Sequence, residues 1–266
     1  MSDLPERTVP VYIVHMNSQP KRWEVLEQRL SHFPSLNPVL VEAIDGNAIP
    51  EADRLSGIHW SYPYRTGCPA MTAGELGCAL SHTKAWTALQ SSDAPWSAVF
   101  EDDVLLSDRL EEAMQASASL LETQSPTIVL LSTNIIAYRK PAASIGGFSF
   151  HSLVSGAGAY AYLLNRSAAD CMIGRVRPLK TPVDWWRPKI GWGIRVFALV
   201  PHVASYSEDR SDSLLEGPRK ELWKARARLG QSLGMRVGVL LFREMPSIWW
   251  RLLFRFHYAV LFPKQW

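Results

Sequence analysis

Three consecutive acids, Glu101, Asp102 and Asp103, directly follow an apolar run at residues 96–100. The run predicts a buried strand, and because side chains alternate along a strand, Glu101 and Asp103 should lie on one side and Asp102 on the other. Carboxylates crowded at such a strand end need a cation or strong donors to compensate their charge. Their oxygens suit the hard ions Mg²⁺ and Mn²⁺, which commonly reach substrates through phosphates. This acidic triplet therefore predicts a metal site; the alternative is a solvated loop whose Asp103 and Asp108 favour the next helix N-terminus.

The segments before the acidic triplet alternate between strand and helix patterns. Residues 9–14 (VPVYIV) are apolar and β-branched, and predict a first strand. Ser18 is expected to cap a helix that carries Pro20 in its first turn. Residues 39–43 predict a second strand, which ends at the turn Asp45-Gly46. Strand, helix and strand in this order predict a parallel pair joined by a right-handed crossover.

Further along, residues 47–71 are irregular and predict a long loop over one edge of the sheet. Thr72 and Glu75 have the spacing of a capping box, which predicts the start of a helix. A helix is also expected from Ser107. Additional strands are predicted at residues 127–132, 159–164 and 194–200. This alternation predicts an α/β fold with a mainly parallel sheet, whose ligands would bind at the carboxyl ends of the strands.

Composition fits a folded globular protein, with 47% apolar and 20% charged residues in 266. The net charge of +3 is unevenly distributed, because residues 219–266 hold ten Lys or Arg against Glu221 and Glu244. This segment, the basic tail, carries +8 and leaves −5 for residues 1–218. We therefore expect a catalytic domain over residues 1–218 and a separate tail over residues 219–266.

The end of the basic tail has apolar residues at helical spacing, with two arginines one turn apart beside them. They are Trp249, Leu252, Leu253, Phe256 and Val260, with Arg251 and Arg255. The pattern predicts an amphipathic helix at a membrane surface, where basic residues meet anionic headgroups. The alternative is a C-terminal helix docked on the catalytic domain. Nucleic-acid binding is a third interpretation, which the apolar content of the tail disfavours.

The three cysteines, Cys68, Cys78 and Cys171, form no CxxC pair and indicate a reducing compartment. The first seven residues lack the pattern of a signal peptide. No stretch approaches the roughly 18 uncharged apolar residues that a spanning helix needs. We therefore expect a cytoplasmic protein that associates with the inner face of the cytoplasmic membrane.

Three segments together resemble glycosyltransferase family 25, which includes bacterial lipooligosaccharide galactosyltransferases. They are residues 11–17 with Arg22, the turn Ala43-Ile-Asp45-Gly46, and Gly74-Glu75-Leu-Gly77-Cys78-Ala-Leu-Ser81-His82 followed by Val99-Phe-Glu101-Asp102-Asp103-Val104. Residues 156–160 and 182–184 are weaker similarities. The resemblance covers about residues 9–205 and implies a GT-A type fold, Rossmann-like with helices on both faces of the sheet.

The resemblance also implies a reaction and a site. It implies inverting transfer of a hexose, often galactose, from a UDP-sugar to a lipopolysaccharide or lipooligosaccharide glycan. A Mn²⁺ or Mg²⁺ ion would be held by Glu101 and Asp103. The nucleotide pocket would be lined by Asn17, Arg22, Asp45, Gly46 and Asp102. For Arg22 the alternative is an exposed helix arginine.

An inverting transferase needs a base for the acceptor hydroxyl. Asp184 is the candidate, and Glu75 and His82 compete with it. His82 could instead orient a carboxylate, touch phosphate or tie the helix to the strand, and the capping box already accounts for Glu75. A non-catalytic carbohydrate- or membrane-binding protein on a degenerate scaffold is the main alternative function. A nucleotidyltransferase is a third, which the absence of a P-loop pattern disfavours.

Overall fold

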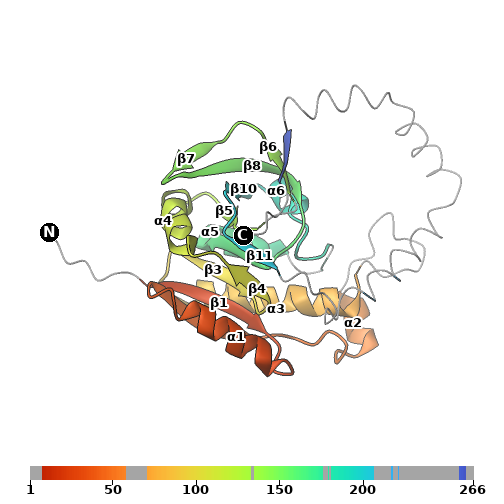
Figure 1. Ribbon diagram of the computed structural model, residues 1–266. Helices are drawn as coiled ribbons and strands as arrows, with labels where there is room; N and C mark the ends of the chain where they lie inside the picture. Colours follow the sequence, from red (N-terminus) through yellow and green to blue (C-terminus); the bar gives the residue numbers. More distant parts are fainter. Residues whose placement is uncertain are drawn as a thin grey trace, which may run out of the picture.

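The structure is a computed structural model that describes residues 8–57, 71–132, 135–175, 179, 181–206, 217, 221 and 258–261. Its centre is a ten-stranded mixed sheet (Figure 1). Along the sheet the strands are β12 (Tyr258–Leu261), β6 (Ile135–Tyr138), β8 (Phe148–Gly156), β10 (Arg195–Val200), β5 (Thr127–Leu130), β9 (Ala161–Asn165), β3 (Trp96–Glu101), β1 (Val9–His15) and β2 (Leu36–Glu42). The short strand β7 (Ala143–Ile145) pairs with β8, and β4 (Val104–Leu106) pairs with β11 (Ala204–Tyr206) as a separate ribbon.

Helices cover both faces of the sheet, as predicted. Helices α3 (Ala73–Gln90) and α5 (Arg166–Arg175) pack on one face, with α6 (Arg187–Gly191) beside them. Helices α1 (Pro20–Leu30) and α4 (Leu110–Leu121) pack on the other. Alternate residues of one strand serve the two cores: Tyr12 and Val14 face α3, whereas Val11 and Ile13 face α1. The strands are therefore buried on both sides, which explains their continuous apolar runs.

The predicted parallel pairing of the first two strands is confirmed, because β1 pairs in parallel with β2, and β1 also pairs in parallel with β3. The sheet is nevertheless mixed. Strand β9 runs antiparallel between β3 and β5, while β5 and β10 are parallel to each other. The parallel pairing of β1 with β3 sets Val14 beside Glu101, so the carboxyl ends of both strands meet at one place.

Two helix starts differ from the sequence-based expectation. Helix α1 carries Pro20 in its first turn as expected, but Gln19 is its N-cap and no side chain caps it, so the predicted Ser18 cap is wrong. The helix expected from Ser107 begins at Leu110, because Ser107 forms the preceding turn, in which its carbonyl accepts a hydrogen bond from the Leu110 backbone N–H. The capping box of Thr72 and Glu75 at the start of α3 is confirmed in both of its hydrogen bonds.

Two longer segments were also predicted incompletely. The expected loop at 47–71 contains a helix, α2 (Glu51–Gly57), before the chain leaves the described residues. The tail helix predicted to include Val260 is wrong there: residues 258–261 form β12, which pairs antiparallel with β6. An open strand edge offers unpaired backbone groups, and satisfying them favours a strand over a helix. Most other tail residues, including 249–256, lie outside the described residues.

Candidate active site

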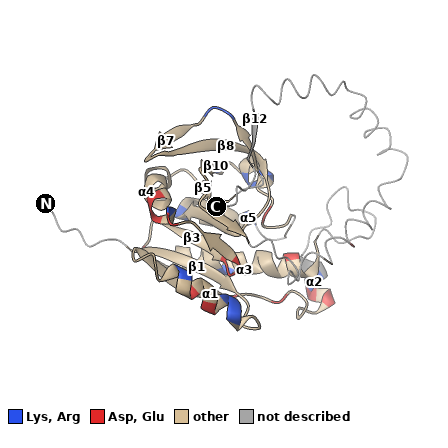
Figure 2. Cartoon of the chain, in the orientation of Figure 1, with Lys and Arg blue, Asp and Glu red and all other residues tan. Residues whose placement is uncertain are grey.

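Strand β3 ends at Glu101, and Asp102 and Asp103 form the turn into β4. Figure 2 shows charged residues concentrated on helices such as α1 and α2, while the strands are largely uncharged. A run of three acids at a strand end is therefore unusual within this fold. The backbone N–H of Glu101 donates to the carbonyl of Tyr160 at 2.9 Å, which holds the strand end against the segment before β9.

Asp102 turns toward α1 and is engaged on both oxygens. His15 Nδ1 lies 2.8 Å from Asp102 Oδ2, and Arg22 Nη1 lies 3.4 Å from Oδ1. The Asp102 side chain is only 10% exposed. His15 ends β1, so the parallel register of β1 and β3 creates this contact. Of the three acids, Asp102 is thus the one neutralised within the protein rather than open to a ligand.

Asp103 is the acid of the triplet whose negative charge is least compensated by the described residues. Burial, then the charges of Glu101 and Asp102, raise its pKa from 3.8 to about 6, although Arg22 lowers it. Arg22 Nη1 lies 3.9 Å from Asp103 Oδ2. Asp103 Oδ1 is buried and has no hydrogen-bond partner among the described residues. The side chain as a whole is 43% exposed, so this carboxylate combines a buried, unpaired oxygen with access from solvent.

Glu101 points toward α3, whereas Asp102 and Asp103 both face Arg22 of α1. The expectation that Glu101 and Asp103 share one side is therefore wrong, because residues 102 and 103 form a turn and the alternation of the strand ends at Glu101. His82 Nε2 lies 3.3 Å and Cys78 Sγ 4.0 Å from Glu101 Oε1. His82 is fully buried, and its Nδ1 lies 2.9 Å from the hydroxyl of Tyr162, which also accepts from Trp86 Nε1 at 2.8 Å. Glu101 remains 31% exposed. Its carboxylate is therefore held by His82 on the side of α3 and is partly open to solvent.

The acidic triplet offers the ligand type of a hard divalent ion, although the described ligand atoms that already lie within 4.8 Å of one another belong to Cys78, His82 and Glu101. The donors are carboxylate oxygens, the ligand type that Mg²⁺ and Mn²⁺ prefer. Asp103 Oδ1 lacks a partner among the described residues, and the neighbouring charges of Glu101 and Asp102 disfavour its ionisation. A cation beside Glu101 and Asp103 would remove both costs.

The predicted nucleotide-binding residues near β1 and β2 are dispersed over the same end of the sheet. Asn17 Nδ2 donates to Glu42 Oε1 at 2.7 Å, and Asp45 Oδ1 accepts from the Asn47 backbone N–H at 2.8 Å. Asn17 and Asp45 are exposed, whereas Gly46 is buried against α3. The structure therefore gives Gly46 a packing role, and leaves Asn17 and Asp45 exposed.

Asp184 lies on the turn before α6, with its Oδ1 buried. Lys189 Nζ donates to the carbonyls of Pro182 at 3.1 Å and Trp185 at 2.7 Å, which fixes this turn. Burial lowers the pKa of Lys189 from 10.5 to about 7, and the charge of Asp184 opposes that shift. Trp186 Nε1 donates to the carbonyl of Gly158 at 2.8 Å, so the Asp184 turn is tied to the segment whose Tyr160 carbonyl holds Glu101.

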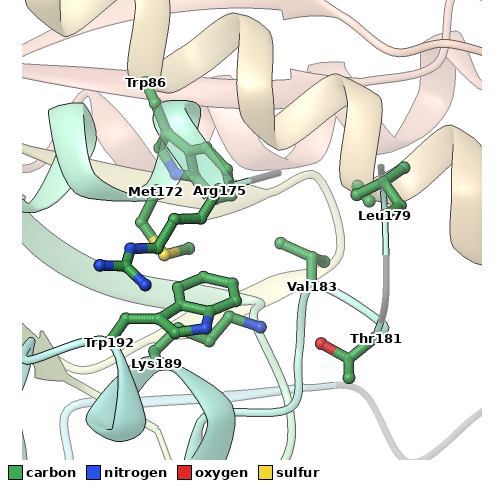
Figure 3. A pocket seen from close by; sticks show the side chains of 9 residues that line it. Trp86, Met172, Arg175, Leu179, Thr181, Val183, Lys189 and Trp192 are labelled. Atoms are coloured by element: carbon green, nitrogen blue, oxygen red, sulfur yellow. The ribbon is translucent and has the colours of Figure 1, made fainter. Parts of the chain in front are cut away.

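A small cavity of about 20 Å³, partly open to solvent, lies between α3, α5 and residues of the segment 179–192. Figure 3 shows Trp86, Arg175, Lys189 and Trp192 around it. Lys189 lies 5.8 Å and 5.7 Å from the ring centroids of Trp186 and Trp192. Trp86 lines this cavity and its ring centroid lies 6.4 Å from that of His82, whereas neither His82 nor Glu101 lines it.

Glu75 forms the capping box at the start of α3. Its Oε2 accepts from the Thr72 backbone N–H at 2.8 Å, its own N–H donates to Thr72 Oγ1 at 3.1 Å, and the residue is buried. Sequence reasoning missed His15, Tyr162, Trp86 and Lys189. Of these, only His15 could have been found from the sequence. It ends the first predicted strand, and the carboxyl ends of neighbouring parallel strands lie at the same edge of a sheet.

An α/β domain with acids at the carboxyl end of a parallel strand is the arrangement in which nucleotide-using enzymes bind their ligands. The sequence profile of glycosyltransferase family 25 (LPS biosynthesis protein) matches residues 8–186. The chain belongs to this family.

Several relatives extend the comparison. LgtB of Neisseria meningitidis, a lacto-N-neotetraose biosynthesis glycosyltransferase, is 31% identical over 128 residues, which are 44% of this chain and 46% of LgtB. LgtB of Neisseria gonorrhoeae is 28% identical over 183 residues, 59% of this chain and 66% of that protein. A probable inactive glycosyltransferase 25 family member 3 of Rattus norvegicus is 24% identical over 196 residues, 67% of this chain and 32% of that protein. The chain thus spans about half to two thirds of the LgtB proteins.

Among solved structures, an active-site mutant of LgtC matches at 11% identity with a TM-score of 0.29, over 71% of this chain and 72% of that chain. This likeness is too remote to define the fold. Among the described helices, none is both long and apolar enough to cross a membrane.

Proposed function

We propose that this protein transfers a hexose, most simply galactose, from a UDP-sugar to a lipopolysaccharide or lipooligosaccharide glycan, with inversion and with the help of a divalent ion. The observation that carries the proposal is the buried Oδ1 of Asp103, which has no hydrogen-bond partner among the residues that the structure describes and belongs to a strand-end acidic triplet of a family 25 chain. A GT-A type of donor site at the carboxyl ends of β1 and β3 is part of the same proposal.

Glu101 and Asp103 would hold the ion, Mn²⁺ or Mg²⁺. When bound, the ion supplies positive charge that stabilises the negative charge developing on the leaving diphosphate. Asp102, held by His15, would keep the Arg22 guanidinium at the edge of the site, where it can also face a phosphate. Asn17 and Asp45, exposed at the same end of the sheet, would contact the nucleoside.

Of the three candidates for the base, Asp184 is favoured. His82 is fully buried behind Glu101, and the carboxylate of Glu75 caps its own helix. Asp184 would accept the proton of the acceptor hydroxyl as that oxygen attacks the anomeric carbon opposite the leaving diphosphate. Lys189, which fixes the backbone on both sides of Asp184, would hold the carboxylate in place.

The basic tail would contact the anionic inner face of the cytoplasmic membrane, close to a lipid-linked acceptor. Ten basic residues against two acidic ones support this location. Binding to vesicles with and without anionic lipid, at low and high salt, measures it. Vesicle binding that depends on neither lipid charge nor salt concentration would contradict the proposed membrane contact.

A second candidate is a non-catalytic glycan-binding protein on a transferase scaffold, which the similarity to a probable inactive family member brings into consideration. The complete acidic triplet favours the enzyme. A screen of common UDP-sugars with Mn²⁺ and a glycan acceptor, reading UDP release and product mass, decides between them. We expect turnover that a chelator abolishes and that Asp103→Asn loses, while the matched control Asp108→Asn, an exposed acid of the next loop, keeps it. Glycan binding without turnover for any donor would favour the second candidate.

A further inference from the structure

A group of four side chains, three of them buried and the fourth the partly exposed Glu101, connects α3, β9 and the acidic triplet. His82 and Trp86 lie one turn apart on α3, and Tyr162 lies on β9 directly opposite Val99 of β3. Val99 and Glu101 are two residues apart on one strand, so Glu101 faces α3 on the same side as Tyr162. Trp86, Tyr162 and His82 are between 0% and 1% exposed, so no water competes for their polar atoms.

The direction of each hydrogen bond follows from which groups can donate. Trp86 Nε1 is a donor only, so at 2.8 Å from Tyr162 Oη it must donate and the hydroxyl must accept. The hydroxyl keeps its own hydrogen, because burial raises the pKa of Tyr162 well above its usual value. That hydrogen needs an acceptor, and among the described residues His82 Nδ1, at 2.9 Å, is the group placed to accept it.

A neutral imidazole that accepts at Nδ1 carries its hydrogen on Nε2. His82 Nε2 lies 3.3 Å from Glu101 Oε1, which can then accept this hydrogen. We propose that Trp86, Tyr162 and His82 form a one-way hydrogen-bond chain that ends on Glu101 and fixes the orientation of its carboxylate. His82 is then a positioning residue: it acts through Glu101 and touches neither the sugar donor nor the glycan acceptor.

The hydrogen-bond chain gives the two carboxylate oxygens of Glu101 different roles. This step rests on the proposed function. Oε1 accepts from the buried His82, which leaves the partly exposed carboxylate to present its other oxygen to the ion. Carboxylates that bind metals are commonly held in this way, and removing the supporting partner typically weakens metal binding about 10–100-fold. His82 also has no free lone pair in this arrangement, which excludes it as the base.

A competing arrangement uses the same atoms differently. Cys78 Sγ, His82 Nε2 and Glu101 Oε1 lie within 4.8 Å of one another, close enough to bind one thiophilic ion such as Zn²⁺. His82 would then bind through Nε2 and carry its hydrogen on Nδ1, and the Tyr162 hydroxyl hydrogen would lose its only acceptor among the described residues. The hydrogen-bond chain satisfies every one of these buried polar groups and is therefore the favoured state.

Nitrogen-15 NMR of the histidine-labelled full chain tests the hydrogen positions without any activity. The resonances missing from His82→Gln identify His82, and we expect a protonated Nε2 and an unprotonated Nδ1 at neutral pH. Tyr162→Phe, which removes the donor to Nδ1, should shift the ring toward a mixture of tautomers. A protonated Nδ1 in the wild-type chain would overturn the proposal. So would a thiolate-to-cobalt absorption band on adding Co²⁺ that Cys78→Ser abolishes, because it would establish the three-ligand site.

Direct Mn²⁺ binding, measured by calorimetry, tests the positioning of Glu101. His82→Ala should weaken Mn²⁺ binding about 10–100-fold. His82→Gln, whose amide can donate to Glu101 from the place of Nε2, should remain within a few-fold of wild type, as should the surface control His32→Gln. Unchanged Mn²⁺ affinity in His82→Ala would contradict the positioning role that we give to the hydrogen-bond chain. A wild-type protein that binds no Mn²⁺ would instead refute the proposed function, with the NMR result still deciding the direction of the hydrogen bonds.

Discussion

Gly46 and Gly77 bring the turn after β2 into backbone contact with α3. A Cβ added to Gly46 would lie 1.7 Å from the Ala73 carbonyl oxygen, and one added to Gly77 would lie 2.4 Å from that of Ile44. The Ile44 backbone N–H also donates to Ser81 Oγ at 2.8 Å. Two motifs separate in the sequence, residues 43–46 and 74–82, are therefore one structural unit. It fixes α3, and with it His82, relative to the strand ends of the site.

Gly77→Ala should destabilise the protein, because its methyl group would meet backbone atoms that cannot rotate away. We expect a loss of about 1–3 kcal/mol or more in the free energy of unfolding, measured with urea. Gly174→Ala is the matched control, since a Cβ there meets nothing within 4 Å and the site is an exposed helix position. Its expected effect is neutral or slightly stabilising. Equal effects of the two substitutions would contradict the close packing of Gly46 and Gly77.

Asp103→Asn should abolish transfer yet stabilise the metal-free protein above about pH 6. The folded pKa of Asp103 is raised from 3.8 to about 6, so its ionisation costs stability above that value. The cost falls as the pH drops from about 6 to 3.8 and is absent below. We expect a gain of less than about 1 kcal/mol, because solvent screens the partly exposed side chain. Urea unfolding with chelator at several pH values measures it. A gain of the same size at every pH would show that the charge of Asp103 is not its cause.

Lys189→Met should change how stability depends on pH. The folded pKa of Lys189 is lowered from 10.5 to about 7, so the unfolded chain binds more protons between these values. The Lys189 contribution to stability therefore rises with pH across this range, by up to about 1.4 kcal/mol per pH unit. The difference between wild type and Lys189→Met should follow that slope, whereas the exposed control Lys21→Met should show none. A difference independent of pH would mean that the buried amine stays charged.

Asp184→Asn should lower kcat about 10²–10⁴-fold while leaving the affinity for UDP-sugar unchanged, as expected for loss of a base that acts on the acceptor. Steady-state kinetics with donor binding by calorimetry separate the two quantities. Glu75→Gln offers a contrast, because weakening a capping box should cost stability of about 1 kcal/mol and leave turnover nearly intact. If Glu75→Gln were the inactive variant and Asp184→Asn the active one, the assignment of the base would be wrong.

The sequence by itself determined the features that depend on neighbouring residues. The apolar strand that ends in Glu101, the capping box of Thr72 and Glu75, and Pro20 in the first turn of α1 are local patterns. The first crossover also followed, because a strand, helix and strand in close succession have essentially one way to pack. The position of the acidic triplet at a strand end could thus be predicted from the order of residues along the chain.

Only the tertiary structure decided which distant residues surround those acids. His15 and Asp102 are 87 residues apart, and Tyr162 and His82 are 80 apart, so no local pattern relates them. Their contacts arise because β1 lies on one side of β3 in parallel and β9 on the other in antiparallel register. Strand β12 makes the same point, since a segment with helical spacing became a strand where an open sheet edge offered it partners. Pairing between distant strands satisfies backbone hydrogen bonds and buried charges together. Which residues meet in this way depends on the folded arrangement of the strands, and no local sequence pattern encodes it.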